Sequence, residues 1–281
     1  MSAPPKPPVV ILTSVGWDFL WQRHHVLATF FAKAGHRVVF VEGLSGSYDY
    51  ASPAYYARIF RKLARTSLRK TGETGERNLL ENLSMYECAV APLQPRILRK
   101  INELVLSSRA ARGIAGLAGG RPIVWNFQPT TTAMQIAENL EPGLLVYDCV
   151  MNFEEVRGMP PDISETEREW VRRADLVFAD SRFLVEKHTP LREDIKQLPP
   201  GVDYDLFSRT GGGAAETVEK VCFFGGMGEG WFDFELAERV ADAGFEVSLI
   251  GWADTGHSLL ITISKGISDA DDDTTARYRR P

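Results

Sequence analysis

Short apolar runs alternate with amphipathic segments between residues 9 and 210, and this alternation constrains the fold more than any other feature. The run at 9–13 is short, continuous and rich in β-branched residues, as expected of a parallel strand covered on both faces. A helical pattern at 20–34 and an apolar run at 38–41 complete a β-α-β unit. Further strands are expected at 85–90, 123–126, 144–147, 176–179 and 195–198, and further helices at 96–117, 131–138, 165–173 and 183–187. The sequence therefore predicts a doubly wound, mostly parallel α/β sheet, which binds ligands at the carboxyl ends of its strands.

The composition is that of an ordinary globular protein, with 44% hydrophobic and 25% charged residues. The net charge of −5 gives no reason to expect nucleic acid as a partner. The first eight residues lack the apolar core of a signal peptide, and no apolar stretch reaches the length of about 18 residues that a membrane span needs. We therefore expect a cytoplasmic protein.

Three cysteines, Cys88, Cys149 and Cys222, are far apart in the sequence and none belongs to a Cys-x-x-Cys motif. This spacing supports neither a zinc site nor a disulfide framework. Each cysteine lies in an apolar stretch, so we expect buried free thiols, no metal and no cofactor.

A basic segment at 54–70 interrupts the α/β pattern with six basic residues and no acidic one. Arg58, Lys62, Arg65 and Arg69 fall at helical spacing on one face. Such a helix can lie on an anionic membrane, which would make the protein peripheral on the inner membrane face. The alternative is a solvated helix whose apolar side packs on the sheet.

The chain is predicted to have two lobes of unequal size. Residues 1–210 form the first domain, and 211–251 provide one strand, one helix and a second strand of another α/β domain. Residues 252–281 follow neither the helical nor the strand period, so we expect a disordered or aberrant tail. Only 71 residues follow position 210, against roughly 100–200 for a common domain, so the second lobe is expected to be incomplete. A frameshift, a gene fragment or a minimal form would each produce this pattern.

Three segments together resemble the bacterial glycosyltransferases of the GT-B fold, in the large retaining family 4. Residues 21–42 combine Trp-Gln-Arg-His-His at the helix start with a Gly-His-Arg-Val entry into the next strand. Residues 174–184 (ADLVFADSRFL) and 198–207 (LPPGVDYDLF) are similar to the family's Ala-Asp-x-Val element and its inter-lobe motif. Residues 223–233 resemble the start of the donor lobe in a branch acting on cell-envelope polysaccharides. The resemblance implies a Rossmann-like acceptor-side lobe followed by a donor-side lobe.

Two residues are catalytic candidates on the acceptor side. His25 is the histidine that matches the family's helix motif, and it could accept a proton from an acceptor hydroxyl. Asp148 follows a predicted strand, although Met151 and Asn152 replace the acidic pair that the family has further on. Both residues have structural alternatives, because the histidine could cap local backbone and the aspartate could cap a turn.

The acceptor-binding candidates surround the end of the first strand and the start of the helix that follows it. They are Gly16, Trp17, Asp18, Arg23 and His24. A glycine there lets the backbone approach a ligand, and an aromatic ring can stack on a sugar. A plain turn glycine and an apolar staple of the helix start are the alternatives.

Gly225 and Gly226 are the donor-binding candidates, in a predicted loop that could face a diphosphate. In the resembling family the second lobe supplies an Arg and a Lys for the diphosphate and a Glu-x7-Glu pair. Glu238 and Glu246 have that spacing, but they lie in a helix and strand too early in the lobe, so the match is interpreted as coincidence.

The resemblance implies transfer of a sugar from a nucleotide-sugar donor to a glycan or lipid-linked acceptor by the full-length form, with this chain impaired. One alternative is a non-catalytic acceptor-binding or partner lobe. Another is a nucleotide-sugar epimerase of the same architecture.

Overall fold

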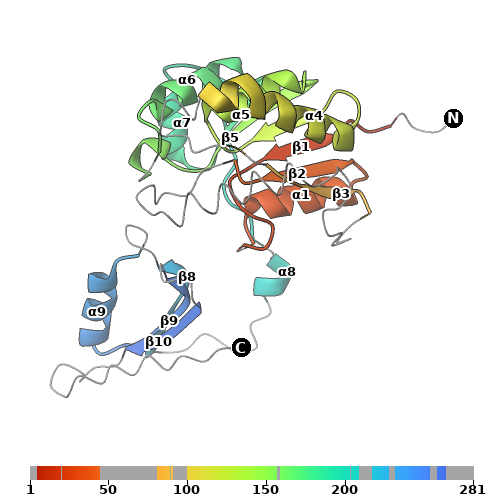
Figure 1. Cartoon of the computed structure of the whole chain (residues 1–281). Helices are drawn as coiled ribbons and strands as arrows, with labels where there is room; N and C mark the ends of the chain where they lie inside the picture. Colours follow the sequence, from red (N-terminus) through yellow and green to blue (C-terminus); the bar gives the residue numbers. More distant parts are fainter. Residues whose placement is uncertain are drawn as a thin grey trace. The chain divides into compact units, whose positions relative to one another are not determined.

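The computed structural model describes residues 5–19, 21–44, 81–88, 90, 100–156, 159–202, 204–208, 217–227, 232–253 and 258–263. The chain divides into two compact units, Met1–Val202 and Asp203–Pro281 (Figure 1).

The first unit is built on a seven-stranded sheet with the order β3-β2-β1-β4-β5-β6-β7. All six strand pairs are parallel. The strands are β1 (Val9–Leu12), β2 (Val38–Glu42), β3 (Leu83–Glu87), β4 (Ile123–Asn126), β5 (Leu144–Cys149), β6 (Leu176–Ala179) and β7 (Lys196–Gln197). The order runs outward from β1 in one direction and from β4 in the other, as in Rossmann-like sheets. The predicted parallel α/β sheet is therefore confirmed.

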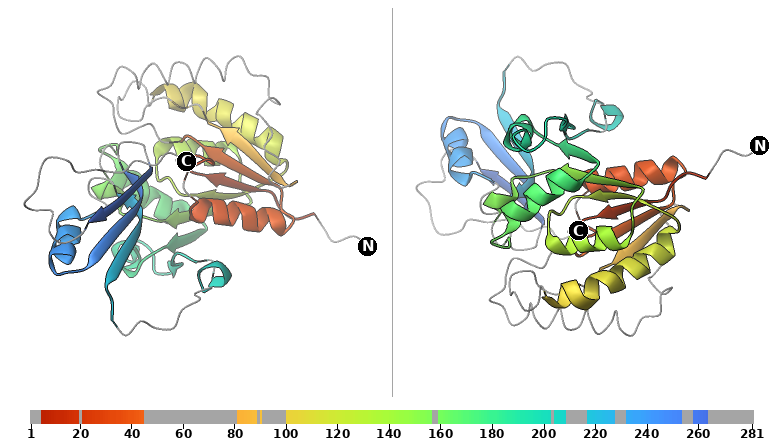
Figure 2. Two further views of the ribbon diagram at one scale, coloured as in Figure 1. Left: turned by 90° about the horizontal axis from the view of Figure 1, so that it is seen from below. Right: turned by 90° about the horizontal axis from the view of Figure 1, so that it is seen from above.

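Helices cover both faces of this sheet. They are α1 (Arg23–Lys33), the π-helical turn η1 (Asn102–Leu106), α4 (Ser107–Ala118), α5 (Thr131–Asn139), the 3-10 turn η2 (Phe153–Glu155), α6 (Ile163–Arg173) and α7 (Arg182–His188). Figure 2 shows α1 and α4 on opposite faces of the strands β1 to β3. Thr130 and Ser181 cap the N-termini of α5 and α7, where their side chains accept hydrogen bonds from backbone amides.

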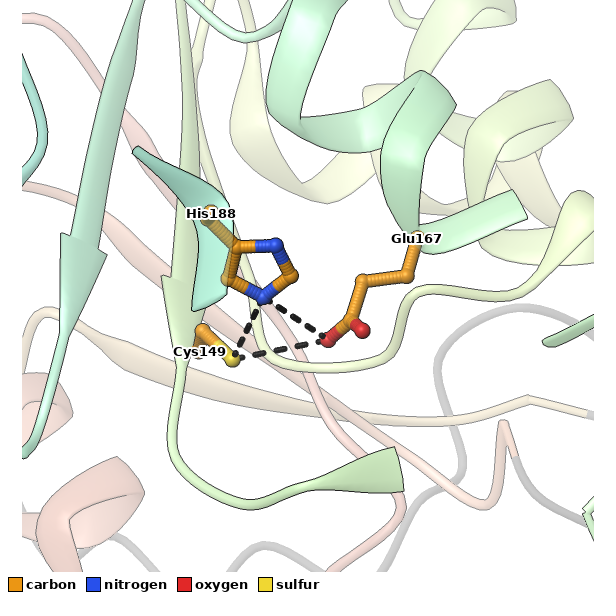
Figure 3. A group of neighbouring side chains, drawn as sticks. All are labelled: Cys149, Glu167 and His188. Atoms are coloured by element: carbon orange, nitrogen blue, oxygen red, sulfur yellow. Dashed lines mark hydrogen bonds and ion pairs between the residues drawn. The ribbon is translucent and has the colours of Figure 1, made fainter. Parts of the chain in front are cut away.

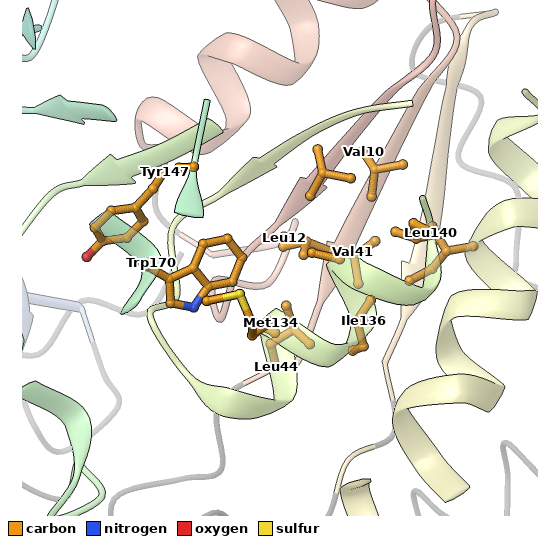
Figure 4. Close-up of a cluster of buried hydrophobic side chains, with 14 of the residues drawn as sticks. Val10, Leu12, Val41, Leu44, Met134, Ile136, Leu140, Tyr147 and Trp170 are labelled. Carbon is orange, nitrogen blue, oxygen red and sulfur yellow. The ribbon is translucent and has the colours of Figure 1, made fainter. Parts of the chain in front are cut away.

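Alternate side chains along a strand point to opposite faces of the sheet and pack against different helices. Val9 and Ile11 pack with α1, whereas Val10 and Leu12 pack with α4 and α5. The second of these clusters extends to Trp170 of α6 and is drawn in Figure 4. Continuous apolar strands predicted burial on both faces, and this division of side chains is the reason.

Strand boundaries differ from expectation at both edges of the sheet and at β5, which extends two residues beyond its predicted end. β3 begins two residues earlier than predicted and ends at Glu87, while β7 keeps only two residues of the predicted four. An edge strand pairs with only one neighbouring strand. The apolar pattern of its sequence therefore predicts where it ends less accurately than for a central strand.

The second unit contains α8 (Tyr204–Phe207), β8 (Lys220–Met227), α9 (Phe234–Asp242), β9 (Glu246–Ala253) and β10 (Ser258–Ile263). Its sheet has the order β10-β9-β8, with β8 and β9 parallel and β9 and β10 antiparallel. The predicted strand, helix and second strand are present. β10 is a further strand within the range where the sequence pattern predicted no regular element.

Candidate functional site

The carboxyl ends of β1 and β4 meet where the strand order of the first unit changes direction. Leu12 and Asn126 are in register, and the Phe127 amide donates to the Leu12 carbonyl at 3.0 Å. Doubly wound sheets bind ligands at this point. The helix α1 begins here and brings its first residues to the same place. We call the group of His24, Phe127 and Gln128 the β1/β4 edge.

Two buried polar atoms at the β1/β4 edge have no hydrogen-bond partner within the described part of the chain, namely Nδ1 of His24 and Oε1 of Gln128. The two residues are only 5% and 4% exposed. The His24 ring lies against Phe127 with 4.1 Å between ring centroids. An unpaired buried polar atom costs free energy, which a ligand that supplied a partner would recover.

His24 is held in its neutral form. Burial, with the positive charges of His25 and Arg23 as smaller causes, lowers the pKa of His24 to about 3. A neutral imidazole has one donor and one acceptor nitrogen, so it suits a sugar hydroxyl, which can also do both. A group with so low a pKa is a poor general base near neutral pH.

His25, a catalytic candidate, is fully buried, and both of its ring nitrogens have partners. Its Nδ1 accepts from the Gln22 amide at 3.0 Å, and its Nε2 lies 3.2 Å from the Gly16 carbonyl oxygen. Its ring also packs against Trp17, Trp21 and Phe40. These contacts are those of a residue that closes the turn before α1, which was the structural alternative.

Asp148, the other catalytic candidate, is fully buried in an ion pair with Arg23. Arg23 Nε lies 3.0 Å from Oδ2 and Nη2 lies 2.9 Å from Oδ1, while Trp125 Nε1 donates to Oδ2 at 3.0 Å. Arg23 also donates to the carbonyl of Leu198. Burial raises the pKa of Asp148 to about 6, and Arg23 only partly opposes this. The contacts join α1, β4 and β5, so the polar atoms of Asp148 are engaged in structural contacts, although its buried charge is disfavoured.

The turn after β1 carries the remaining acceptor-side candidates. The Trp17 amide donates to Oε2 of Glu42 at 2.8 Å, and the Trp17 ring meets Trp21 edge-on. A Cβ at Gly16 would lie 3.4 Å from the same Glu42 oxygen, an ordinary contact, so this glycine is not required by space. Asp18 is exposed, and Trp21 is 60% exposed. Trp21 therefore presents more ring surface to a sugar than Trp17 does.

On the donor side, Gly225 and Gly226 lie within β8 and not in a loop after it. Gly225 pairs with Gly251 of β9, and both have a positive φ. A Cβ on Gly251 would lie 1.7 Å from the Gly225 carbonyl oxygen. Close approach of the β8 backbone is therefore the physical reason for glycine at position 251, whereas a Cβ on Gly225 would meet only the Phe223 side chain.

The proposed membrane-contact residues, Arg58, Lys62, Arg65 and Arg69, lie outside the described residues, and their role stays a prediction. Among the helices that the structure describes, none combines the length and apolar character needed to cross a bilayer.

Sequence reasoning missed a buried cluster formed by Cys149 of β5, Glu167 of α6 and His188 of α7 (Figure 3). The three residues come from separate elements and share no short motif, so their spacing in the sequence did not indicate that they form a cluster. Cys149 and Cys88 are buried as predicted, but the prediction of burial is wrong for Cys222, which lies on the exposed face of the β8 strand.

No protein-family model matches this sequence, and no curated protein matches it either.

Proposed function

We propose that this chain is a glycosyltransferase-family protein of GT-B architecture, and that its first unit binds a glycan or lipid-linked acceptor at the β1/β4 edge. The observation that carries the proposal is the pair of buried atoms, His24 Nδ1 and Gln128 Oε1, without partners among the described residues at the ligand-binding point of a doubly wound sheet. The Rossmann-like strand order supports the architecture. The motif resemblance supplies the reaction, transfer from a nucleotide-sugar donor.

In this proposal His24 binds and orients an acceptor hydroxyl. Nδ1 of its neutral ring forms a hydrogen bond with the hydroxyl. The side-chain carbonyl oxygen of Gln128 accepts a hydrogen bond from the same sugar or from the adjacent sugar. Trp21 offers an exposed ring at the entrance to α1 for stacking on a sugar face. Orientation of this kind lowers the barrier by placing the hydroxyl for attack.

The donor side must stabilise the negative charge of a departing nucleoside diphosphate. β8 is the outer strand of the described sheet, so one of its sides has no paired strand among the described residues. Consecutive amides of a strand point to opposite sides, so only one of the Gly225 and Gly226 amides can point to that side; this pair supplies our candidate for diphosphate contact. Neither glycine adds a charge, so cationic groups elsewhere are needed for rapid transfer.

Saturation-transfer NMR with octyl β-glucoside, octyl β-galactoside and octyl α-mannoside tests the acceptor site. We expect at least one glycoside to bind, and we expect His24→Phe and Gln128→Leu to abolish the signal. Thr29→Val is the matched control, because it removes a buried unpartnered oxygen from a residue of α1 that is not part of the β1/β4 edge. Equal binding by all four proteins would refute the assignment of the site.

A transfer and hydrolysis assay with UDP- and GDP-sugars, together with calorimetric titration of UDP and GDP, tests the reaction. Turnover that depends on an added glycoside supports the transferase proposal. No turnover and no nucleotide binding by a folded protein would refute it.

A second function, that of a non-catalytic acceptor-binding lobe, is favoured by one observation. Both catalytic candidates, His25 and Asp148, have their polar atoms engaged in structural contacts. Glycoside binding without turnover or nucleotide binding would select this function over the transferase.

A further inference from the structure

The cluster of Cys149, Glu167 and His188 has the composition of a transition-metal site. It combines one thiol, one carboxylate and one imidazole, each at most 2% exposed. Sulfur and imidazole nitrogen are donors that favour zinc and its neighbours over magnesium or calcium. The three donors come from β5, α6 and α7, so an ion between them would join three elements.

The donor atoms have the separations of a tetrahedral site. Sγ of Cys149 lies 3.4 Å from Oε1 of Glu167 and 3.7 Å from Nε2 of His188, and the last two atoms are 3.6 Å apart. Zinc bonds of about 2.3 Å to sulfur and about 2.0–2.1 Å to nitrogen and oxygen place tetrahedral donors about 3.3–3.6 Å from one another. Figure 3 shows the three side chains pointing toward a common centre.

Neighbouring side chains hold the carboxylate in position. Tyr147 donates to Oε1 of Glu167 at 2.8 Å, and Lys187 Nζ lies 2.9 Å from the other oxygen, Oε2. Outer partners of this kind orient a ligating carboxylate in metal sites. Lys187 uses Oε2 and leaves the side of Oε1 that faces the thiol and the imidazole for an ion.

The local charges also suit a divalent cation. Lys187 lies 3.5 Å from Glu154 and 2.9 Å from Glu167, so the ammonium group is shared by two carboxylates. With the Cys149 thiol deprotonated by the metal, three negative charges face the ammonium and a doubly charged ion. The charges then balance once the exposed Glu154 is counted with the buried groups, which lowers the cost of taking an ion out of water.

We propose that Cys149, Glu167 and His188 form a buried transition-metal site that takes Zn²⁺ and fastens α6 and α7 to the carboxyl end of β5. Binding transfers the thiol proton of Cys149 to solvent and forms metal bonds to Sγ, Oε1 and Nε2. A tetrahedral ion with three protein ligands has one further position, which suits a water molecule. The site is independent of the proposed sugar chemistry.

The test uses the full chain, stripped of metal by a chelator and titrated with Co²⁺. We expect absorption from thiolate-to-cobalt charge transfer in the near ultraviolet, at one ion per chain, and its loss when Zn²⁺ is added. Cys149→Ser should abolish the band, while Cys222→Ser, which removes an exposed thiol from the other unit, should keep it. Tyr147→Phe, outside the ligand set, should weaken Zn²⁺ binding by about 10–100-fold.

Zinc should also raise the thermal midpoint of the wild type and of Cys222→Ser, but not that of Cys149→Ser. Absence of the charge-transfer band in folded wild-type protein would overturn the proposal and leave the cluster as a hydrogen-bonded network only. A band that persists in Cys149→Ser would overturn it as well. The wild-type measurement alone can overturn the proposal, so the test does not depend on whether the Cys149→Ser variant folds.

Discussion

Replacing His24 with Phe should make the protein less sensitive to acid. His24 is buried in neutral form with a pKa of about 3, against 6.5 for the unperturbed group. As pH falls below 6.5, the unfolded chain binds a proton at this position and the folded chain does not. Stability is therefore lost on acidification between about pH 6.5 and pH 3. Phe keeps a ring against Phe127 and removes the titration.

The size of the effect follows from the two pKa values. Between about pH 7.5 and pH 4.5, the extra proton of the unfolded state destabilises the wild type by about 2.5 kcal/mol, at about 1.4 kcal/mol per pH unit once His24 is well below its unfolded pKa. We expect the stability difference, His24→Phe minus wild type, to grow by this amount over that interval. At neutral pH the variant loses a buried unpartnered nitrogen, so we expect it to be no less stable than the wild type.

Urea unfolding of both proteins at several pH values, followed by tryptophan fluorescence, measures the difference. Thr29→Val is the control, because it also removes a buried unpartnered polar atom from α1 but titrates nothing. Its stability relative to the wild type should be the same at every pH. Parallel stability curves for His24→Phe and the wild type would refute the reasoning that His24 is buried neutral.

Other substitutions test the packing around the site. Asp148→Asn should gain stability relative to the wild type by at most about 3 kcal/mol as pH rises from about 4 to 7. The reason is the raised pKa of Asp148, about 6, which makes the wild type lose stability as its carboxyl ionises. Urea unfolding at those pH values measures the difference, and a difference that stays constant with pH would contradict the prediction. Gly113→Ala should destabilise the protein by about 1–3 kcal/mol, because the new Cβ would lie 2.7 Å from the Tyr86 ring. Gly116→Ala on the same helix places a Cβ that meets nothing within 4 Å, so it should stabilise the protein by up to about 1 kcal/mol. Thermal melts that rank the two variants in the opposite order would contradict this prediction. Thr130→Ala should cost about 1 kcal/mol through loss of the hydrogen bond that caps α5, and an unchanged unfolding midpoint would show that the cap contributes nothing.

The architecture of the first unit was predictable because its physical signal is local. Residues 9–12 and 38–41 are apolar and buried because both faces of the sheet are covered, and the helices between strands are amphipathic. The strand β10 was missed although Ser258–Ile263 (SLLITI) is a short run rich in apolar and β-branched residues; its local strand signal was outweighed by the absence of any period in the surrounding residues. The exposure of Cys222 was missed for a different reason, since an apolar run does not say which face of a strand is covered.

Site chemistry was less predictable because it depends on contacts between distant residues. Arg23, at a helix start, and Asp148, at a strand end, are 125 positions apart, and the sequence did not indicate that they pair. Cys149, Glu167 and His188 meet only because β5 and β6 are neighbours and α6 and α7 follow them in turn. Sequence spacing gave no cue to either set.

The choice between His24 and His25 shows how one residue of helical rotation decides a functional assignment. Successive side chains on an α-helix point about 100° apart, so two adjacent histidines at the start of α1 cannot serve the same environment. The motif resemblance favoured His25, but that ring lies against Trp17 and Phe40, and both of its nitrogens contact backbone atoms of the turn before α1. His24 lies against Phe127, beyond the end of β4, and keeps Nδ1 unpaired among the described residues. If the first unit binds a sugar at the β1/β4 edge, the helix geometry therefore assigns the contact to His24 and the support of that edge to His25.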